Sequence, residues 1–218
     1  MLLEEIVSKK APQNFSRDRI NYQMGVLGRS LKQLGSGHQS TAFGHINKPN
    51  MVVKTIQLKD NDPVIPFLEI CLANKTNPFL PRIYTIKEYK RERDRYLIIT
   101  MERLKMLRGP GNPFNGFDLF YDLRILPSPR DKQHPLYVRI QQSNWNFGEL
   151  TDALYDMFSE PYLRQWLVKN TPNKQLAQVI TQLDHLFDEF YADLHLDNFA
   201  IRDTGSTPQL VLFDPVMG

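Results

Sequence analysis

The sequence predicts an α+β protein of two lobes, in which a small antiparallel sheet carrying one helix is followed by a mainly helical part. Between residues 34 and 104, short runs that alternate apolar and polar residues are separated by turns containing glycine or asparagine, as in antiparallel sheets. From residue 147 onwards, apolar residues recur every three or four positions, as in helices packed on a core. A chain of 218 residues is long enough for one large domain or for two small lobes that share a cleft.

The first lobe is expected at residues 34–104. An N-terminal helical extension at 1–33 should precede it, because the apolar residues of 20–34 have helical spacing. In chain order the lobe should hold strands at 41–46 and 51–56, a helix at 63–74, and strands at 82–87 and 96–101. The stretch 87–95 mixes charges of both signs, which favours a solvated hairpin turn over a phosphate-binding patch.

The second lobe is expected at residues 105–218. It should begin with an irregular insertion at 107–145, because 107–135 is rich in proline and glycine and shows no sustained period. Helices are predicted at 147–158 and 173–191, and short strands at 198–202 and 209–213. The second helix should be the buried one, because its apolar residues follow three- and four-residue steps: Leu176, Val179, Ile180, Leu183, Leu186, Phe187 and Phe190.

Composition argues against several classes of protein. The net charge of +3 is small for this length and does not indicate nucleic-acid binding. No apolar run is long enough to cross a bilayer, and the first residues lack the apolar centre of a secretory signal, so we expect no membrane partner and a cytoplasmic location. The five histidines are scattered and no Cys-x-x-Cys pair exists, which argues against a zinc site, and the single cysteine, Cys71, fits a reducing compartment.

A turn rich in small residues lies between a first short strand and the strand predicted at 41–46. Gly35, Gly37 and Ser40 would let backbone N–H groups lie over phosphates without side-chain clashes. The same pattern is typical of an ordinary tight hairpin, so this segment alone leaves both interpretations open.

Lys54 and Glu69 are charged residues in apolar surroundings. Lys54 follows Val52 and Val53 in a predicted strand, which favours an inward side chain over one that extends to solvent at a strand edge. Glu69 is the only carboxylate in the middle of the predicted helix, and a buried acid needs a cationic partner, for which Lys54 is the obvious candidate. The alternative is that Glu69 faces solvent.

The segment Asp193-Leu-His-Leu-Asp-Asn198 is followed by a short apolar strand that leads into Asp214. This arrangement resembles the protein-kinase-like superfamily, whose catalytic loop reads Asp-Leu-x-x-x-Asn and whose metal-binding aspartate ends a strand shortly afterwards. For each aspartate taken alone, the alternative is a helix N-cap or a turn.

The resemblance implies a bilobal protein-kinase-like fold that binds ATP with Mg2+ and transfers a phosphoryl group. Asp193 would accept the proton of the substrate hydroxyl or orient it, and Asn198 and Asp214 would hold the metal ions. Lys54, paired with Glu69, would hold the α and β phosphates. The remaining nucleotide-binding residues would be Gly35, Gly37, Ser40 and Glu102.

Within the superfamily, residues 34–104 and 175–216 resemble the early serine/threonine protein kinases of lytic bacteriophages. The matching motifs are Gly35-Ser-Gly-His-Gln-Ser-Thr-Ala-Phe43, Pro49-Asn-Met-Val-Val-Lys54, the Asp193 segment and Phe213-Asp-Pro-Val216. The likeness implies that the substrates are host proteins in the bacterial cytoplasm, and that their modification reprogrammes host transcription and contributes to its shutoff.

Departures from the kinase pattern concern the substrate. Tyr191 and Ala192 stand where protein kinases carry His-Arg, and only four residues follow Asp214, so we expect no activation segment of the usual kind. Residues 107–170 or a partner would then supply the platform for a peptide, unless the substrate is not a peptide.

His195 keeps another class of substrate open. Aminoglycoside- and choline-kinase-like enzymes often carry histidine at this position, where it could donate a hydrogen bond to the transferring phosphate. One alternative is therefore a small-molecule phosphotransferase. Another is a non-catalytic kinase-fold module that binds and inhibits a host protein, although such a module has no physical need for the lysine, the glutamate, both aspartates and the asparagine.

Overall fold

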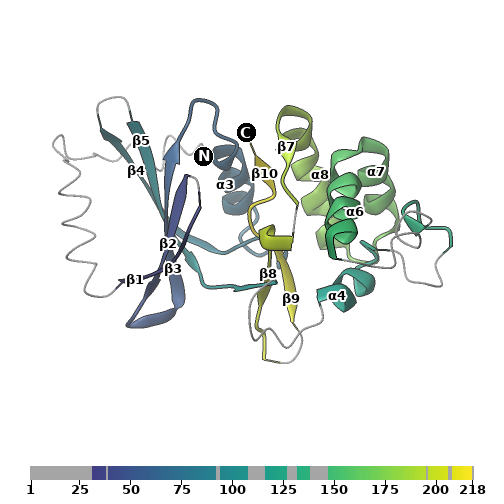
Figure 1. Ribbon diagram of the computed structural model, residues 1–218, viewed down its shortest axis with the longest axis horizontal. Coiled ribbons are helices and arrows are strands. Elements are labelled where there is room, and N and C mark those ends of the chain that lie inside the picture. The colour runs from purple at the N-terminus through teal and green to yellow at the C-terminus, as the bar shows by residue number, and fades with distance from the viewer. Residues whose placement is uncertain are drawn as a thin grey trace. The chain divides into compact units, whose positions relative to one another are not determined.

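A computed structural model describes residues 31–37, 39–91, 94–107, 116–126, 132–137, 147–194, 196–205 and 208–217 (Figure 1). The described residues fall into two compact units. The first comprises the residues up to Leu72 together with Arg82–Arg103, and the second comprises Ala73–Pro81 together with the residues from Leu104 onwards. The fold is mixed α+β, as predicted.

The first unit is built on a five-stranded antiparallel sheet with the strand order β1-β2-β3-β5-β4. One helix, α3, accompanies it (Figure 1). The helix begins after Asp62, whose carboxylate accepts the backbone N–H of Val64 at 3.1 Å. The elements are β1 (Leu31–Ser36), β2 (Ser40–His45), β3 (Lys48–Leu58), α3 (Val64–Ala73), β4 (Ile83–Arg91) and β5 (Asp94–Glu102).

The predicted strands and helix of the first lobe are confirmed, and β3, β4 and β5 are longer than expected. The charged stretch 87–95 lies largely within β4 and β5, which stay paired as far as Arg91 and Asp94. An ion pair between Arg95 and Glu88, at 2.7 Å, joins the two strands within this stretch. The turn is therefore shorter than the sequence suggests, and residues 92–93 lie outside the described residues.

The helical extension predicted at 1–33 is wrong at its C-terminal end, and the rest of it lies outside the described residues. Residues 31–36 form β1, which pairs with β2. A Cβ atom at Gly44 would lie 3.2 Å from Cδ2 of Leu34, so glycine is what allows the Leu34 side chain to lie against the neighbouring strand. Strand pairing thus outweighs the helical spacing of the apolar residues.

The second unit combines helices with two small antiparallel sheets. Its helices are α4 (Gly116–Asp122), α6 (Phe147–Ser159), α7 (Pro161–Asn170) and α8 (Lys174–Glu189). One sheet has the order β6-β8-β9, formed by β6 (Lys105–Met106), β8 (Phe199–Arg202) and β9 (Gln209–Leu212), and in the other β7 (Tyr191–Ala192) pairs with β10 (Val216–Met217). No helix within the described ranges is long and apolar enough to cross a membrane.

α8 is the buried helix that the sequence predicts. Its N-cap is Asn173, whose side-chain oxygen accepts the backbone N–H groups of Gln175 and Leu176 at 3.0 and 3.2 Å. Phe190, just after the helix, is half-buried. The six predicted positions within the helix are all buried: Leu176, Val179, Ile180, Leu183, Leu186 and Phe187.

The segment expected to be an irregular insertion, 107–145, contributes in part to the core of the second unit. Phe120 of α4 is fully buried, and its ring meets that of Phe199 edge-on with the centroids 5.0 Å apart. Leu126 and Leu136, which follow α4, are also buried. Apolar side chains that show no regular spacing in the sequence therefore pack into the core here. The rest of the insertion lies outside the described residues.

Residues 73–81, named here the α3–β4 linker, belong to the second unit, whereas the sequence places them in the first lobe. The side chain of Asn77 donates to the carbonyl oxygen of Gln175 at 3.1 Å. Arg202 donates to two carbonyl oxygens of the linker. Bonds to residues about a hundred positions further along the chain therefore decide where the linker belongs.

Candidate functional site

Asp193, Asn198 and Asp214 are brought together in the second unit by a chain of hydrogen bonds. The backbone N–H of Asp193 donates to the carbonyl oxygen of Pro215 at 2.9 Å, and the backbone N–H of Phe213 donates to the carbonyl oxygen of Asn198 at 2.9 Å. The side-chain amide of Asn198 donates to the carbonyl oxygen of Asp193 at 2.5 Å. Each neighbour of Asp214 is therefore bonded to one of the other two positions.

Two pairs of strands hold these residues in place. β7 ends just before Asp193 and pairs with β10, which begins two residues after Asp214. β8 begins directly after Asn198 and pairs with β9, which ends two residues before Asp214. The three positions are thus fixed by regular backbone pairing, which is the kind of support that a precise site requires.

The side chains of these residues offer oxygen atoms suited to a hard cation. Asn198 is buried, and Asp193 and Asp214 are half-buried. The side-chain nitrogen of Asn198 donates a hydrogen bond, so its side-chain carbonyl oxygen is the atom that could bind a metal. Mg2+ binds such carbonyl oxygens as it binds carboxylate oxygens. Among the described residues, no group of three or more His, Cys, Asp or Glu side chains could hold a metal ion.

Lys54 lies in the middle of an apolar sheet face of the first unit. Its cross-strand partners are Ala42 on β2 and Ile99 on β5, and residues directly opposite each other share a face. Val52 and Ile56, the neighbours of Lys54 on this face, are buried, and Lys54 itself is half-buried. An ammonium group in such surroundings is destabilising unless an anionic or polar group compensates its lost hydration.

The glycine turn joins β1 to β2. The backbone N–H of Gly37 donates to the carbonyl oxygen of Ser40 at 2.8 Å. Among the described residues, no atom would lie within 4 Å of a Cβ atom at Gly35, and a Cβ atom at Gly37 would lie 3.8 Å from Oγ of Ser40. Neither crowding by the described residues nor a left-handed backbone therefore requires glycine at these positions, and glycine lets a phosphate approach the backbone closely.

Three other predicted site residues remain, and only the surroundings of Glu69 and Glu102 are described. His195 lies outside the described residues. Glu69 is half-buried on α3, and its ion pair with Lys54 stays a prediction. Glu102 is buried and has a structural task, because its carboxylate accepts the backbone N–H of Arg82 at 2.8 Å and its own N–H donates to the carbonyl oxygen of Arg82 at 3.0 Å. It thereby fixes the start of β4 against the end of β5, and its contact with a nucleotide stays a prediction.

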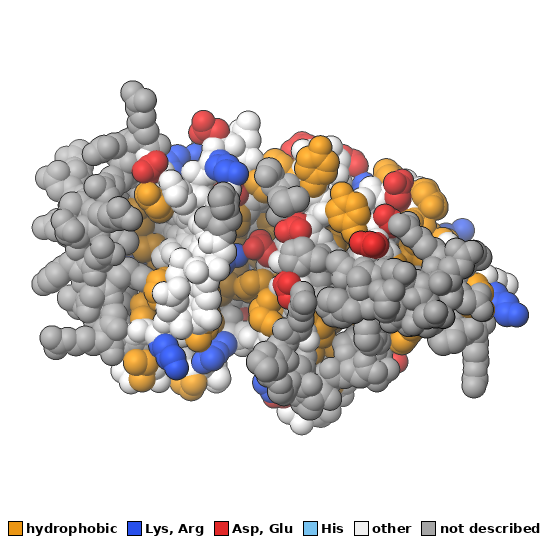
Figure 2. Space-filling view, viewed as in Figure 1, with side chains coloured by type: hydrophobic (Ala, Val, Ile, Leu, Met, Phe, Trp, Pro, Cys, Tyr) orange, Lys and Arg blue, Asp and Glu red, His pale blue; other side chains and the backbone are white. Residues whose placement is uncertain are grey.

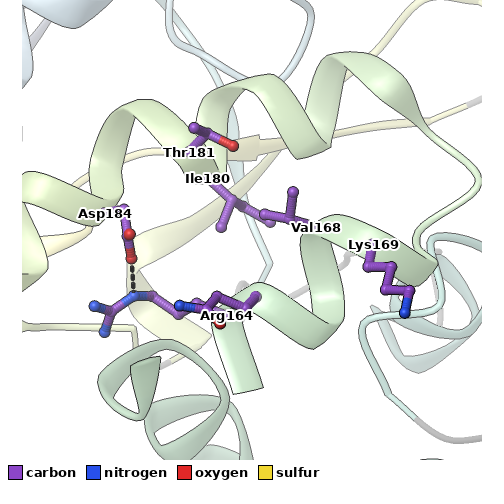
Figure 3. Close-up of a pocket in the computed structure, with 7 residues that line it drawn as sticks. Arg164, Val168, Lys169, Ile180, Thr181 and Asp184 are labelled. Carbon is purple, nitrogen blue, oxygen red and sulfur yellow. Dashed lines mark hydrogen bonds and ion pairs between the residues drawn. The ribbon is translucent and has the colours of Figure 1, made fainter. Parts of the chain in front are cut away.

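A pocket of about 260 Å³ lies between α7 and α8, and none of the predicted site residues that the structure describes lines it (Figure 3). Acidic side chains are visible over the helices of the second unit (Figure 2). Asp184 and Asp188 accept hydrogen bonds from the buried guanidinium of Arg164. The same guanidinium donates to the carbonyl oxygens of Phe158 and Ser159 at 2.7 and 2.9 Å. Sequence analysis missed Arg164, whose role is structural. The pocket is lined by Arg164, Gln165, Val168, Lys169, Ile180, Thr181 and Asp184.

No protein-family model matches this sequence, and no curated protein matches it. The residues that point to a function are therefore those of the motifs that resemble kinases, together with the hydrogen bonds that hold Asp193, Asn198 and Asp214.

Proposed function

We propose that this chain is a phosphotransferase with a bilobal protein-kinase-like fold, which uses ATP and Mg2+ to phosphorylate serine or threonine hydroxyls of host proteins. Modification of those proteins would reprogramme host transcription, as the resemblance to the early kinases of lytic bacteriophages implies. The observation that carries the proposal is the hydrogen-bonded framework of Asp193, Asn198 and Asp214. Phosphoryl transfer requires that a proton acceptor and two oxygen ligands for one cation keep fixed positions relative to one another. This framework would hold them in those positions.

Two features of the first unit support the proposal. Lys54 places a cation on a largely apolar face, from which it would donate to a phosphate. The turn at Gly35 and Gly37 is not crowded by the other described residues. The proposal requires that Lys54 and the glycine turn bind the same triphosphate whose metal ions would be held by Asn198 and Asp214.

The proposed roles follow from the chemistry of each side chain. The substrate hydroxyl oxygen attacks the γ-phosphorus of ATP, the bond between that phosphorus and the β–γ bridging oxygen breaks, and ADP leaves. Asp193 accepts the proton of the attacking hydroxyl. Lys54, positioned by Glu69, holds the α and β phosphates. The oxygens of Asn198 and Asp214 would hold magnesium, which would supply positive charge where negative charge develops.

Phosphate transfer to host proteins tests the proposal directly. The wild-type protein, incubated with γ-labelled ATP, Mg2+ and bacterial lysate, should label proteins on serine or threonine, and EDTA should prevent it. Asp193→Ala and Asp214→Ala should abolish the label. Asp197→Ala is the matched control, because this exposed aspartate lies in the same loop and has no assigned role.

The outcomes separate the proposal from its alternatives. Absence of labelled protein with the wild type, or equal labelling by Asp193→Ala, would refute the protein kinase. Label in a soluble metabolite would favour a small-molecule phosphotransferase. A full effect on the host from Asp214→Ala would favour a module that binds without catalysis.

A further inference from the structure

Two exposed tyrosines lie on neighbouring elements of the second unit. Tyr155 of α6 is 42% exposed and Tyr191 of β7 is 70% exposed, and β7 lies against α6. Asp152, three residues before Tyr155, is also exposed, and residues three apart are neighbours on a helix surface. In Figure 2, hydrophobic side chains lie beside acidic ones over α6 and β7. Asp152, Tyr155 and Tyr191 are named here the tyrosine surface.

The part of the chain that forms this surface is strongly acidic, although the whole chain has a net charge of +3. Residues 140–163, which include α6, and residues 175–201, which include β7, together contain nine Asp or Glu residues and no Lys or Arg. Arg164 is bonded to two of the nine carboxylates, those of Asp184 and Asp188. The positive charge of the chain is therefore concentrated elsewhere, and this part attracts cationic groups.

The tyrosine surface lies close in the chain to the proposed proton acceptor. Tyr191 is two residues before Asp193, and the bond from the backbone N–H of Asp193 to the carbonyl oxygen of Pro215 continues the pairing of β7 with β10. Tyr191, Ala192 and Asp193 are exposed, buried and half-buried in turn, as in an extended segment whose alternate residues face the same side. Two extended residues span about 7 Å, so a peptide whose serine lay at Asp193 would reach Tyr191 within a few residues.

Exposed tyrosine rings and carboxylates together suit an arginine-rich peptide. An aromatic face attracts a guanidinium group within about 6 Å of the ring centre, and a carboxylate accepts paired hydrogen bonds from the same group. Tyrosine also contributes strongly to protein interfaces, because it offers a large contact area and has few rotamers to lose. The negative charge of this part would repel the phosphates of a nucleic acid, which favours a cationic protein segment as the occupant.

We propose that the tyrosine surface binds an arginine- or lysine-rich segment of the substrate protein, next to the serine or threonine that is phosphorylated. The inference rests on the proposed function and adds the class of substrate to it. Asp152 and Tyr155 lie within residues 107–170, one of the places from which the sequence predicts a substitute for the activation segment. The tyrosine surface would therefore form part of the platform for the peptide.

Fluorescence anisotropy of labelled peptides tests the surface without nucleotide or catalysis. The probes are a short peptide with several arginines before a serine and the same peptide with alanine in place of each arginine. We expect the arginine peptide to bind about tenfold more tightly or better, with an affinity that falls as salt is added. The double variant Tyr155→Ser/Tyr191→Ser should weaken its binding about tenfold, and Asp152→Asn about fivefold.

Tyr84→Ser and Asp122→Asn are the matched controls. Tyr84 is a 50% exposed tyrosine on β4 of the first unit, and Asp122 is an exposed aspartate at the end of α4. Both variants should bind the arginine peptide as the wild type does. In phosphate transfer to the same peptide, the double tyrosine variant should raise KM about tenfold and leave kcat nearly unchanged, because it removes binding that is equal in the ground state and the transition state.

Equal binding of the two peptides, or wild-type affinity in the double tyrosine variant, would overturn the inference. An equal loss of affinity in Tyr84→Ser and Asp122→Asn would also overturn it, because the effect would then not belong to this surface. If Tyr191→Ser does not fold, Tyr155→Ser/Asp152→Asn replaces the double variant with the same expected result. If the wild type transfers no phosphate but binds the arginine peptide selectively, the proposed function fails while the docking surface is confirmed.

Discussion

Lys54 is a charged side chain at an apolar position, so its contributions to stability and to activity can be separated. Methionine has a similar length and no charge, and Lys54→Met should keep the packing opposite Ile99 while removing a half-buried ammonium. The free energy of unfolding, measured by urea denaturation, should change by less than about 1 kcal/mol. Phosphotransfer should fall by about a hundredfold or more, because charge stabilisation at the phosphates is lost.

Lys87→Met is the control for this substitution. Lys87 is exposed on β4, so its replacement should alter neither stability nor phosphotransfer. Wild-type activity in Lys54→Met would contradict the phosphate-binding role, whereas a large loss of stability would show that the lysine is structural.

The carboxylate of Asp203 should make the stability of the protein depend on pH. A hydrogen bond from Lys105, at 2.8 Å, lowers the pKa of Asp203 below the usual aspartate value, and the backbone N–H of Gly205, at 3.0 Å, lowers it further. Because the pKa is lower in the folded state, the stabilisation is present above the usual aspartate pKa and is lost as the pH falls through the folded value. NMR titration should show that the pKa of Asp203 lies below the usual aspartate value, and Lys105→Met should raise that pKa. The same pKa in the variant would contradict the assignment.

At the scale of elements, the contact between α7 and α8 depends on Arg164. Arg164→Met would leave Asp184, Asp188 and two backbone carbonyl groups without their donor. The two carboxylates are 39% and 60% exposed, so water would replace part of the interaction. We expect the free energy of unfolding to fall by about 2 to 4 kcal/mol in urea denaturation.

Gln165→Met tests whether this loss is specific. The side chain of Gln165 is exposed on the same helix, so its replacement should change the free energy of unfolding by less than about 0.5 kcal/mol. Equal stability of the two variants would mean that the buried ion pairs contribute nothing.

Elements with local signals could be predicted from the sequence, and elements fixed by distant partners could not. The spacing of apolar residues and the N-cap Asn173 are local, and they identify α8. α7 was not predicted, because its buried position Arg164 is charged and its acceptors Asp184 and Asp188 lie 20 and 24 residues away. A short strand was expected before the glycine turn, but its start at Leu31 was not, because the helical spacing of the apolar residues extends to Leu34 and the pairing with β2 is not local.

The division of the whole molecule was predictable only in part. The predicted boundary after residue 104 lies one residue from the observed change of unit after Arg103. The α3–β4 linker was assigned to the wrong unit, since its partner Arg202 is more than a hundred positions away. Motif spacing predicts that Asp193 and Asp214 are site residues. The β7–β10 pairing that fixes them has two residue pairs, too few to leave a pattern in the sequence.

The response of the whole molecule to nucleotide tests whether the two units share one site. A ligand stabilises the parts of a protein whose unfolding releases it, so ATP with Mg2+ should slow hydrogen exchange around both Lys54 and Asp214. At a concentration of one hundred times Kd, the free energy of unfolding should rise by about 2.7 kcal/mol, and EDTA should remove most of this rise. Asp214→Asn should remove the dependence on Mg2+, whereas Asp197→Asn should keep it. Protection confined to one unit would contradict a shared site, because a triphosphate held by both an ammonium group and bound metal ions loses binding energy when either unit opens.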